Sequence, residues 1–244
     1  MQTRKIEGIV INETNYSESS KILNVFTRDL GIISVMSKGC RKLKSKLRSV
    51  STKLTYGNFI VSYKPNGIST LIEVDSIYNF KNIMLDINKI SYASFLLELA
   101  GGVANQNSDS EVFEILISCL KKINEGLNPV IITMISELKF LKFLGIDISL
   151  DCCSNCGSTT DIITLSSDRG GYICKGCYEN ELIVTEKSLK VIRLLYYVDI
   201  DKITKLDLAH QTIKEINSFL EEYYDKYSGL YLKSKQFIQI LNNV

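Results

Sequence analysis

The stretch KLTYGNFIVSYKPNGISTLIEVDSI, residues 53–77, holds two runs rich in β-branched and aromatic residues, separated by Lys64-Pro65-Asn66-Gly67. Such runs favour extended strands, and Asn66-Gly67 fits a tight turn because both residues tolerate positive φ. The stretch therefore predicts a β-hairpin. Three similar runs precede it, and Asp29-Leu30-Gly31 supplies a turn between the second and third. The five predicted strands cover residues 5–12, 21–27, 32–37, 53–63 and 68–77.

Five short strands without helical periodicity predict a small closed barrel. The OB-fold is the five-stranded barrel that most often binds nucleic acid, and an SH3-like barrel is the alternative that strands alone leave open. From about residue 86 the apolar residues recur at helical spacing. We therefore predict an α+β protein with an OB-fold domain over residues 1–80 and a helical domain over residues 81–244. A zinc-finger-like insertion is expected to interrupt the helical domain at residues 150–180.

Helix boundaries are marked by capping residues. Asn128-Pro129 and Gly145 bound a segment that is apolar nearly all round, which predicts a central core helix. Ser108 and Glu111 have the spacing of a capping box. Further helices are predicted to begin near Thr185, Asp207 and Ser234.

Four cysteines form two C-x₂-C pairs separated by 17 residues, Cys153 with Cys156 and Cys174 with Cys177. Two such pairs can complete the tetrahedral shell of one structural Zn²⁺, which leaves no open coordination position for catalysis. A hairpin over residues 162–165 and 171–173 is expected between the pairs. The alternatives are four reduced core thiols or a redox-active pair, and the doubled spacing favours zinc over both.

The remaining cysteines and small residues of this region carry weaker signals. Cys152 could replace Cys153, but the two-residue spacing favours Cys153. Cys40 and Cys119 are isolated and are expected to be packing residues. Gly157 and Gly176 stand where a metal-binding turn often needs positive φ.

Positive charge is concentrated in the predicted barrel. The first 80 residues carry twelve Lys and Arg against six Asp and Glu, whereas the remainder is slightly acidic. Half of those cations fall in one run between the third and fourth strands, and we expect them to bind phosphates. They are Lys38, Arg41, Lys42, Lys44, Lys46 and Arg48. Clustered cations bind a phosphate backbone without sequence preference, although a solvated loop is the other common fate of such a run.

Aromatic residues on the fourth strand add a second possible contact with DNA. Tyr56, Phe59 and Tyr63 offer rings on which bases could stack, although at least half of these rings should belong to the barrel core. No nucleotide-binding or hydrolase motif accompanies them, and His210 is the single histidine. The chain is therefore predicted to bind and not to catalyse.

Both ends of the chain resemble the RecO family. The N-terminal stretch NYSESSKILNVFTRDLG (residues 15–31), Lys38-Gly39 and the basic run carry the resemblance, as does GLYLKSKQFI (residues 229–238). The two cysteine pairs fall where many family members carry theirs. Cys40 stands where the family often has Ala, which we interpret as a neutral departure.

The resemblance implies a DNA repair and recombination mediator that binds single- and double-stranded DNA and anneals complementary strands. It implies RecR and the C-terminal tail of the single-strand-binding protein as partners, and an indirect role in loading RecA. Two rival functions remain open, an RNA-binding OB and zinc-ribbon factor, and a scaffold that binds an acidic protein.

No targeting signal or membrane-spanning run is visible in the sequence. We therefore expect a cytoplasmic protein with no membrane partner, and the resemblance adds association with the nucleoid.

Overall fold

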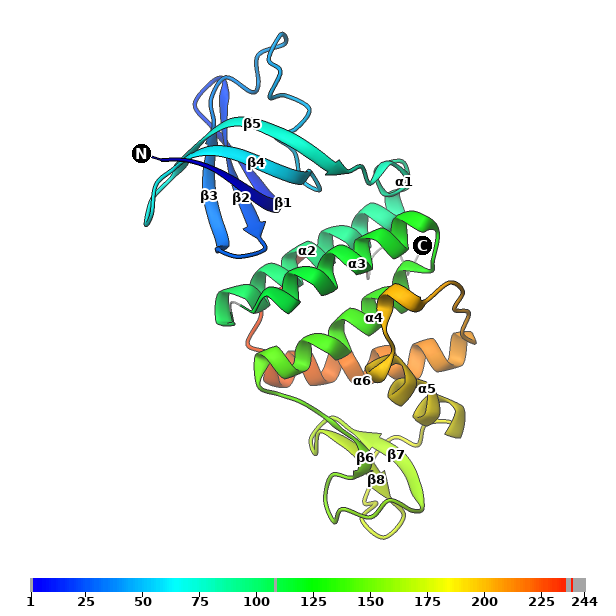
Figure 1. The fold of residues 1–244 in the computed structure, drawn as a ribbon. Helices are drawn as coiled ribbons and strands as arrows, with labels where there is room; N and C mark the ends of the chain where they lie inside the picture. The colour runs from blue at the N-terminus through cyan, green and yellow to red at the C-terminus, as the bar shows by residue number, and fades with distance from the viewer. Residues whose placement is uncertain (1, 108, 236–237, 239–244) are drawn as a thin grey trace.

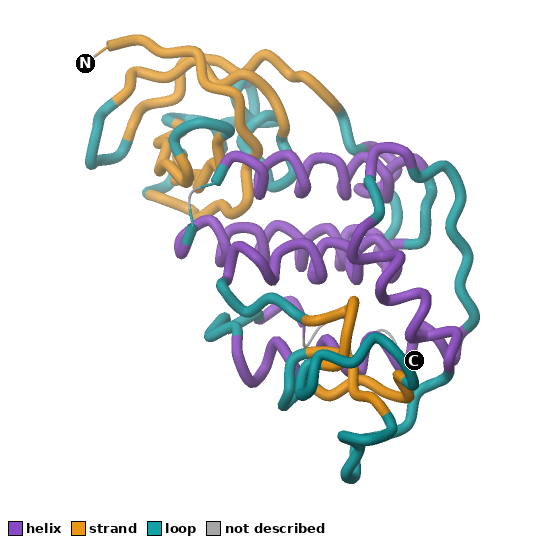
Figure 2. Tube along the Cα trace, turned by 60° about the horizontal axis from the view of Figure 1, so that its bottom comes forward, coloured by secondary structure: helices purple, strands orange, loops and turns teal. Residues whose placement is uncertain are grey.

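A computed structural model describes residues 2–107, 109–235 and 238 of the 244-residue chain. Figure 1 shows an N-terminal β-barrel, a stack of helices beside it, and a small sheet at the opposite end of the helices. Figure 2 shows the same three parts from another direction, with strands at both ends of the helical stack. Within the described residues, no helix is both long enough and apolar enough to cross a membrane.

The barrel consists of five strands, as the sequence predicts. They are β1 (Gln2–Tyr16), β2 (Ser20–Thr27), β3 (Gly31–Ser37), β4 (Tyr56–Tyr63) and β5 (Ser69–Tyr78). The strands close in the order β1-β2-β3-β5-β4, and a parallel contact of β3 with β5 joins Val35 to Ser69. This arrangement confirms the predicted OB-type barrel followed by helices.

Strand β1 is longer than predicted because it pairs with two neighbours. Residues 2–9 pair with β4 and residues 8–16 pair with β2, and a bulge between Val10 and Asn12 interrupts the pairing with β2. A bulge bends a strand and increases its twist, and this bend closes the barrel. Fully buried apolar side chains such as Leu23, Val25 and Phe59 fill the interior.

The helical part contains six α-helices and two short 3₁₀ turns among the described residues between 81 and 227. They are α1 (Lys81–Met84), α2 (Ile87–Gln106), α3 (Ser110–Glu125), α4 (Pro129–Phe140), η1 (Leu141–Leu144), α5 (Glu186–Tyr197), η2 (Ile200–Lys202) and α6 (His210–Tyr227). Helix α4 contacts α2, α3, α5 and α6, so the predicted central helix is confirmed. Asn128 caps it, because its side chain accepts a hydrogen bond from the Val130 N–H, and Gly145 adopts positive φ at the far end of η1.

Four other predicted helix starts have different outcomes. Helix α5 begins after Thr185, as predicted, whereas α6 begins at His210, three residues beyond Asp207. The predicted capping box is wrong, because Asp109 caps α3 by accepting from the Glu111 N–H. Ser108 itself lies outside the described residues. Residues 233–235 are helical, so the start predicted near Ser234 is confirmed, although most of the following segment also lies outside them.

The barrel and the helices share one hydrophobic core. Ile9, Phe26 and Tyr56 of the barrel belong to the same buried cluster as Phe80 and Phe113. The Phe26 and Phe113 rings meet edge to face, with 5.4 Å between their centroids. This continuity fixes the barrel against α2 and α3.

A polar network at the same junction centres on Arg28. Its Nε and Nη2 donate to the two carboxylate oxygens of Glu7 at 2.9 and 3.0 Å, and its Nη1 pairs with Glu114 of α3. The Tyr56 hydroxyl also donates to Glu7, at 2.5 Å. Burial opposes ionisation of Glu7, but the hydrogen bonds from Arg28 and Tyr56 outweigh it and hold the pKa of Glu7 below 4.5.

Replacing Arg28 with Met is therefore expected to destabilise the fold by about 1–3 kcal/mol, because it leaves the half-buried Glu7 without its bidentate partner. The free energy of unfolding in urea measures this loss. Lys5→Met is the matched control. Its 3.5 Å pair with Asp75 is exposed on both sides, so the change should be nearly neutral. Equal losses of unfolding free energy in the two variants would contradict the stabilising role of the Arg28 and Glu7 pair.

A buried carboxyl group on α4 predicts a pH dependence. Glu137 is 8% exposed, and burial raises its pKa from 4.5 to about 8, against the opposing charge of Lys235. The folded state therefore binds this proton more tightly than the unfolded state, and stability falls as the pH rises from about 4.5 to about 8.

Glu137→Gln keeps the shape of the protonated acid and removes this loss. Wild type should lose on the order of 3–5 kcal/mol relative to the variant between about pH 5 and about pH 8. Urea unfolding of both proteins across this range gives the comparison. Parallel pH profiles would show that the carboxyl group ionises freely in the folded protein.

Candidate metal centre and nucleic-acid surface

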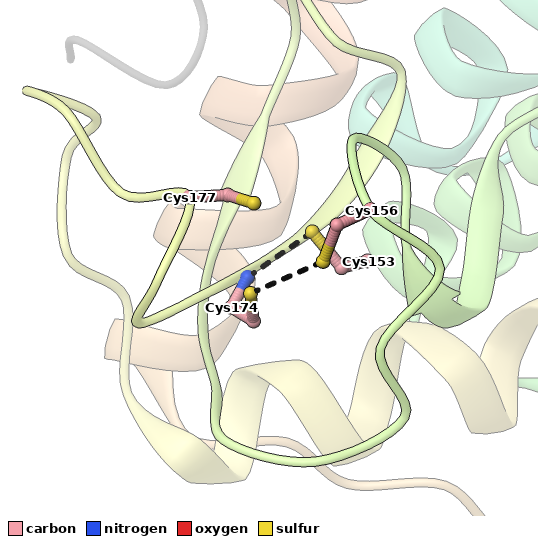
Figure 3. A group of neighbouring side chains, drawn as sticks. All are labelled: Cys153, Cys156, Cys174 and Cys177. Carbon is pink, nitrogen blue, oxygen red and sulfur yellow. Dashed lines mark hydrogen bonds between the residues drawn. The ribbon is translucent and has the colours of Figure 1, made fainter.

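The small sheet carries the four cysteines. It contains β6 (Ser149–Cys153), β7 (Ile162–Ser166) and β8 (Gly171–Cys174), in the order β6-β8-β7. Strands β7 and β8 form the hairpin that the sequence predicts between the cysteine pairs. Two of the cysteines end β6 and β8, and the other two follow in the turns after those strands (Figure 3).

The sulfur atoms of Cys153, Cys156, Cys174 and Cys177 all lie within 4.8 Å of one another. Four sulfurs bound tetrahedrally at about 2.3 Å from Zn²⁺ would be about 3.8 Å apart, so the observed group needs only a small contraction. Cys152 lies outside this group, and its sulfur instead faces the Ser149 hydroxyl at 3.5 Å.

The turns that hold the cysteines differ from the prediction in one respect. Gly157 has a φ of 75°, and its N–H donates to the Cys153 carbonyl at 2.9 Å. Gly176 does not adopt positive φ, so its predicted role is wrong. Cys177 still completes its turn, because its N–H donates to the Cys174 carbonyl at 3.0 Å.

Backbone N–H groups point at the most buried thiol of the group. Burial opposes ionisation of Cys153, but N–H groups including that of Cys174, at 3.5 Å from the sulfur, outweigh it and lower the pKa of Cys153 to about 6. A thiolate is the form that ligates a metal. With its four sulfur atoms so close together, this group could hold a metal ion.

Tyrosine side chains attach the cysteine-bearing sheet to the helices. Tyr172 of β8 donates to the Leu189 carbonyl of α5, and Tyr223 of α6 donates to the Ile146 carbonyl at 2.9 Å. Tyr227 donates to the Asp168 carbonyl at 3.2 Å. The cysteine-bearing sheet lies on the side of the helices away from the barrel (Figure 1).

The cations of the basic run lie on an ordered loop between β3 and β4, which we call the basic loop (residues 38–55). All six predicted phosphate ligands are exposed, and within the described chain none of them forms an ion pair. Four backbone hydrogen bonds between residues three apart, beginning with Lys42 N–H to the Gly39 carbonyl at 3.1 Å, fold the loop into turns.

Apolar and hydroxyl groups fix the basic loop to the barrel. Cys40 is 1% exposed, and Leu47 packs against the barrel interior. The buried hydroxyl groups of Ser37 and Ser51 are 2.7 Å apart and join the two ends of the loop. The loop therefore presents its charges on a folded support, and Cys40 has the packing role that the sequence predicts.

The aromatic residues of β4 have three different environments. Tyr56 is 4% exposed and packs between Phe80 and Phe113, so it has no face for a base and its predicted stacking role is wrong. Phe59 is buried in the barrel. Tyr63 remains partly exposed, and the Arg4 guanidinium lies 4.6 Å from its ring centroid. No sequence motif marks Arg4, because its partner is about 60 residues away.

Models of known protein families match both the barrel and the helical part of the chain. Residues 1–80 match the family model for the recombination protein O N terminal, and residues 84–236 match the model for its C terminal. The chain belongs to the RecO family. This membership confirms the resemblance seen at the two ends of the sequence.

Named RecO relatives cover nearly the whole chain. A DNA repair protein RecO from Listeria monocytogenes serotype 4b is 36% identical over 239 residues, which are 96% of this chain and 93% of the relative. A DNA repair protein RecO from Bacillus cytotoxicus is 35% identical over 243 residues, 98% of both chains. The RecO likeness therefore includes the barrel, the helices and the cysteine-bearing sheet.

Proposed function

We propose that this RecO-family protein is a non-catalytic DNA-binding recombination mediator in DNA repair. The observation that carries the proposal is the basic loop, whose six exposed cations lack acidic partners among the described residues and project from an OB-type barrel. OB barrels bind strands through basic grooves, and cations without acidic partners retain the charge that neutralises phosphates.

Phosphate contacts of this kind support binding of both single- and double-stranded DNA, because both present the same backbone charge. They also support annealing, since cations that neutralise two complementary strands reduce the repulsion between them. The six proposed contacts are those of Lys38, Arg41, Lys42, Lys44, Lys46 and Arg48. Tyr63 is the stacking residue that we retain.

The proposed domains are an OB-fold domain over residues 1–80 and a helical domain over residues 81–244, with an insertion at residues 150–180. One structural Zn²⁺ bound by Cys153, Cys156, Cys174 and Cys177 would stabilise this insertion. Such a metal links segments too small to form a core of their own, and four thiolate ligands leave no position for a substrate.

The proposed partners follow from the family. They are RecR and the C-terminal tail of the single-strand-binding protein, with RecA loaded indirectly onto strands that the single-strand-binding protein covers. The relatives are named DNA repair proteins, which supports a repair role at the nucleoid.

A competition experiment distinguishes this function from its two rivals. A labelled DNA strand bound to the full-length protein is titrated with unlabelled DNA, RNA or an acidic polypeptide. We expect unlabelled DNA to displace the label at the lowest concentration. More effective displacement by RNA would favour an RNA-binding factor, and more effective displacement by the polypeptide would favour a scaffold.

A further inference from the structure

A groove of about 710 Å³ lies between the barrel, helix α2 and the segment that follows α6. Figure 1 shows this segment, red in the colour bar, rising from the end of α6 toward α2. One wall is the outer face of β1, β2 and β3, which contributes Asn12, Asn24 and Ser34. The volume is in the range of sites that enclose a ligand.

The outer face of strands 2 and 3 is the surface through which OB barrels bind oligonucleotides. Asn24 and Ser34 are register partners there, and the Ser34 hydroxyl donates to the Asn24 amide oxygen at 3.5 Å. The amide nitrogens of Asn12 and Asn24 donate to no group in the described part of the chain. They remain available to the edge of a base.

The opposite wall carries an exposed aromatic ring. Tyr231 lines the groove and is 75% exposed, which is unusual for a large side chain beside a hydrophobic core. The preceding residue, Leu230, packs against Gly102 of α2, where a Cβ atom would approach it to 2.9 Å. This contact anchors the backbone next to the ring.

Glu98 of α2 fixes the position of the same segment. Its carboxylate accepts hydrogen bonds from the Lys233 N–H at 3.0 Å and from the Ser234 N–H at 2.9 Å, and also from the Ser234 hydroxyl. Partial burial opposes ionisation of Glu98, but these bonds outweigh it and hold the pKa of Glu98 below 4.5. Among the groove-lining residues that the structure describes, one is acidic, namely Glu98. Its carboxylate oxygens already accept the hydrogen bonds from residues 233 and 234.

Two lysines give the groove its positive charge. Lys53, from the end of the basic loop, and Lys233, beside Tyr231, both line the groove. Neither forms an ion pair with a described residue. Lys53 also makes the groove continuous with the basic loop, so a strand bound to the loop has a charged route into it.

We propose that this groove is a second contact site for single-stranded DNA, in which a base stacks on Tyr231 while Lys53 and Lys233 bind the flanking phosphates. The proposal rests on the proposed function and adds to it a site specific for unpaired bases. A duplex keeps its bases stacked on one another, so it would bind the basic loop without using Tyr231. Aromatic side chains flanked by cations are the common means of binding single strands.

The chain contains no tryptophan, which makes a clean optical test available. Tyr231→Trp places one indole in the groove, and its fluorescence is followed while an oligothymidylate strand or a DNA duplex is added. We expect quenching by the strand and little change with the duplex. Leu182→Trp is the matched control, because Leu182 is 76% exposed on the segment after β8, and its indole should respond to neither.

Affinity measurements distinguish the contribution of the Tyr231 ring to strand binding from that of the two lysine charges. Tyr231→Ala should weaken strand binding by roughly 5- to 150-fold with an unchanged salt slope and unchanged duplex affinity. Lys53→Ala with Lys233→Ala should instead flatten the salt dependence of log K by about 1.4 for single strands.

The outcomes distinguish this site from the proposed function. Normal duplex affinity of the Tyr231→Trp variant, with an indole that the strand does not quench, would overturn the groove assignment and leave the proposed function intact. Quenching by an acidic peptide but not by the strand would also overturn it, since the groove would then be a peptide site. Failure of the wild-type protein to bind any DNA would overturn the proposed function itself.

Discussion

Changing Lys42, Lys44 and Lys46 together to Glu is expected to abolish most DNA binding by the basic loop, whatever the sequence of the strand. Each lost phosphate contact lowers the slope of log K against log salt by about 0.7 for single strands, which gives roughly 2 for the three. The same contacts account for roughly 50-fold in affinity at about 0.15 M salt. Equilibrium titrations at several salt concentrations measure both quantities.

The control is the charge reversal of Lys202 in η2, Lys205 in the following loop and Lys214 in α6, all outside the basic loop. Lys202 and Lys205 are exposed, and their ion pairs with described residues are those with Asp199 and Asp207, so their loss should cost little stability. DNA affinity should remain nearly intact. Equal losses from the two triple variants would mean that net charge alone determines binding. If the basic-loop variant bound DNA more weakly but kept the wild-type slope of log K against log salt, a folding defect would be indicated.

Removing the metal is expected to have the largest effect on stability. Purified protein should contain about one zinc per chain, and Cys156→Ser or Cys174→Ser should lose it. Structural zinc contributes on the order of 10 kcal/mol in small metal-dependent folds, so residues 150–180 should unfold locally without it. Metal analysis and limited proteolysis of this segment, with and without a chelator, measure the two effects.

Cys152→Ser provides the matched control, because its thiol faces Ser149 and lies outside the sulfur group. This variant should retain its zinc and its resistance to protease. The DNA affinity of the zinc-free variants should change far less than their stability, since the basic loop lies at the other end of the molecule. Zinc-free wild-type protein after gentle purification would refute the assignment, as would equal zinc loss from Cys152→Ser.

Local sequence patterns predicted most of the secondary structure, because the residues that decide it are neighbours in the chain. The alternation of β-branched residues and the Asn66-Gly67 turn predicted the barrel strands, and Asn128-Pro129 with Gly145 bounded the central helix. The predicted capping box was wrong because two neighbouring residues compete for the same role. Asp109 and Ser108 are adjacent residues that can both cap a helix, and one residue of shift decides between them.

The cysteine group and the basic loop were also predictable from spacing. Two C-x₂-C pairs bring four thiols together on two tight turns, and six cations in eleven residues remain clustered in any loop conformation. What spacing could not predict was the support beneath these charges. Cys40 is buried and Leu47 packs against the barrel core, which strands distant in the chain build together.

The amino-acid sequence thus determined the strands, the central helix, the cysteine group and the family, all of which depend on short-range order. The tertiary structure decided which aromatic rings are available. Tyr56 and Tyr63 belong to one strand, yet α3 covers only Tyr56. Tertiary structure also placed Tyr231 beside the barrel. The Glu98 carboxylate accepts hydrogen bonds from the backbone of Lys233 and Ser234, which lie 135 and 136 positions further along the chain. Such contacts form only when distant segments pack on a common core, so no local pattern encodes them.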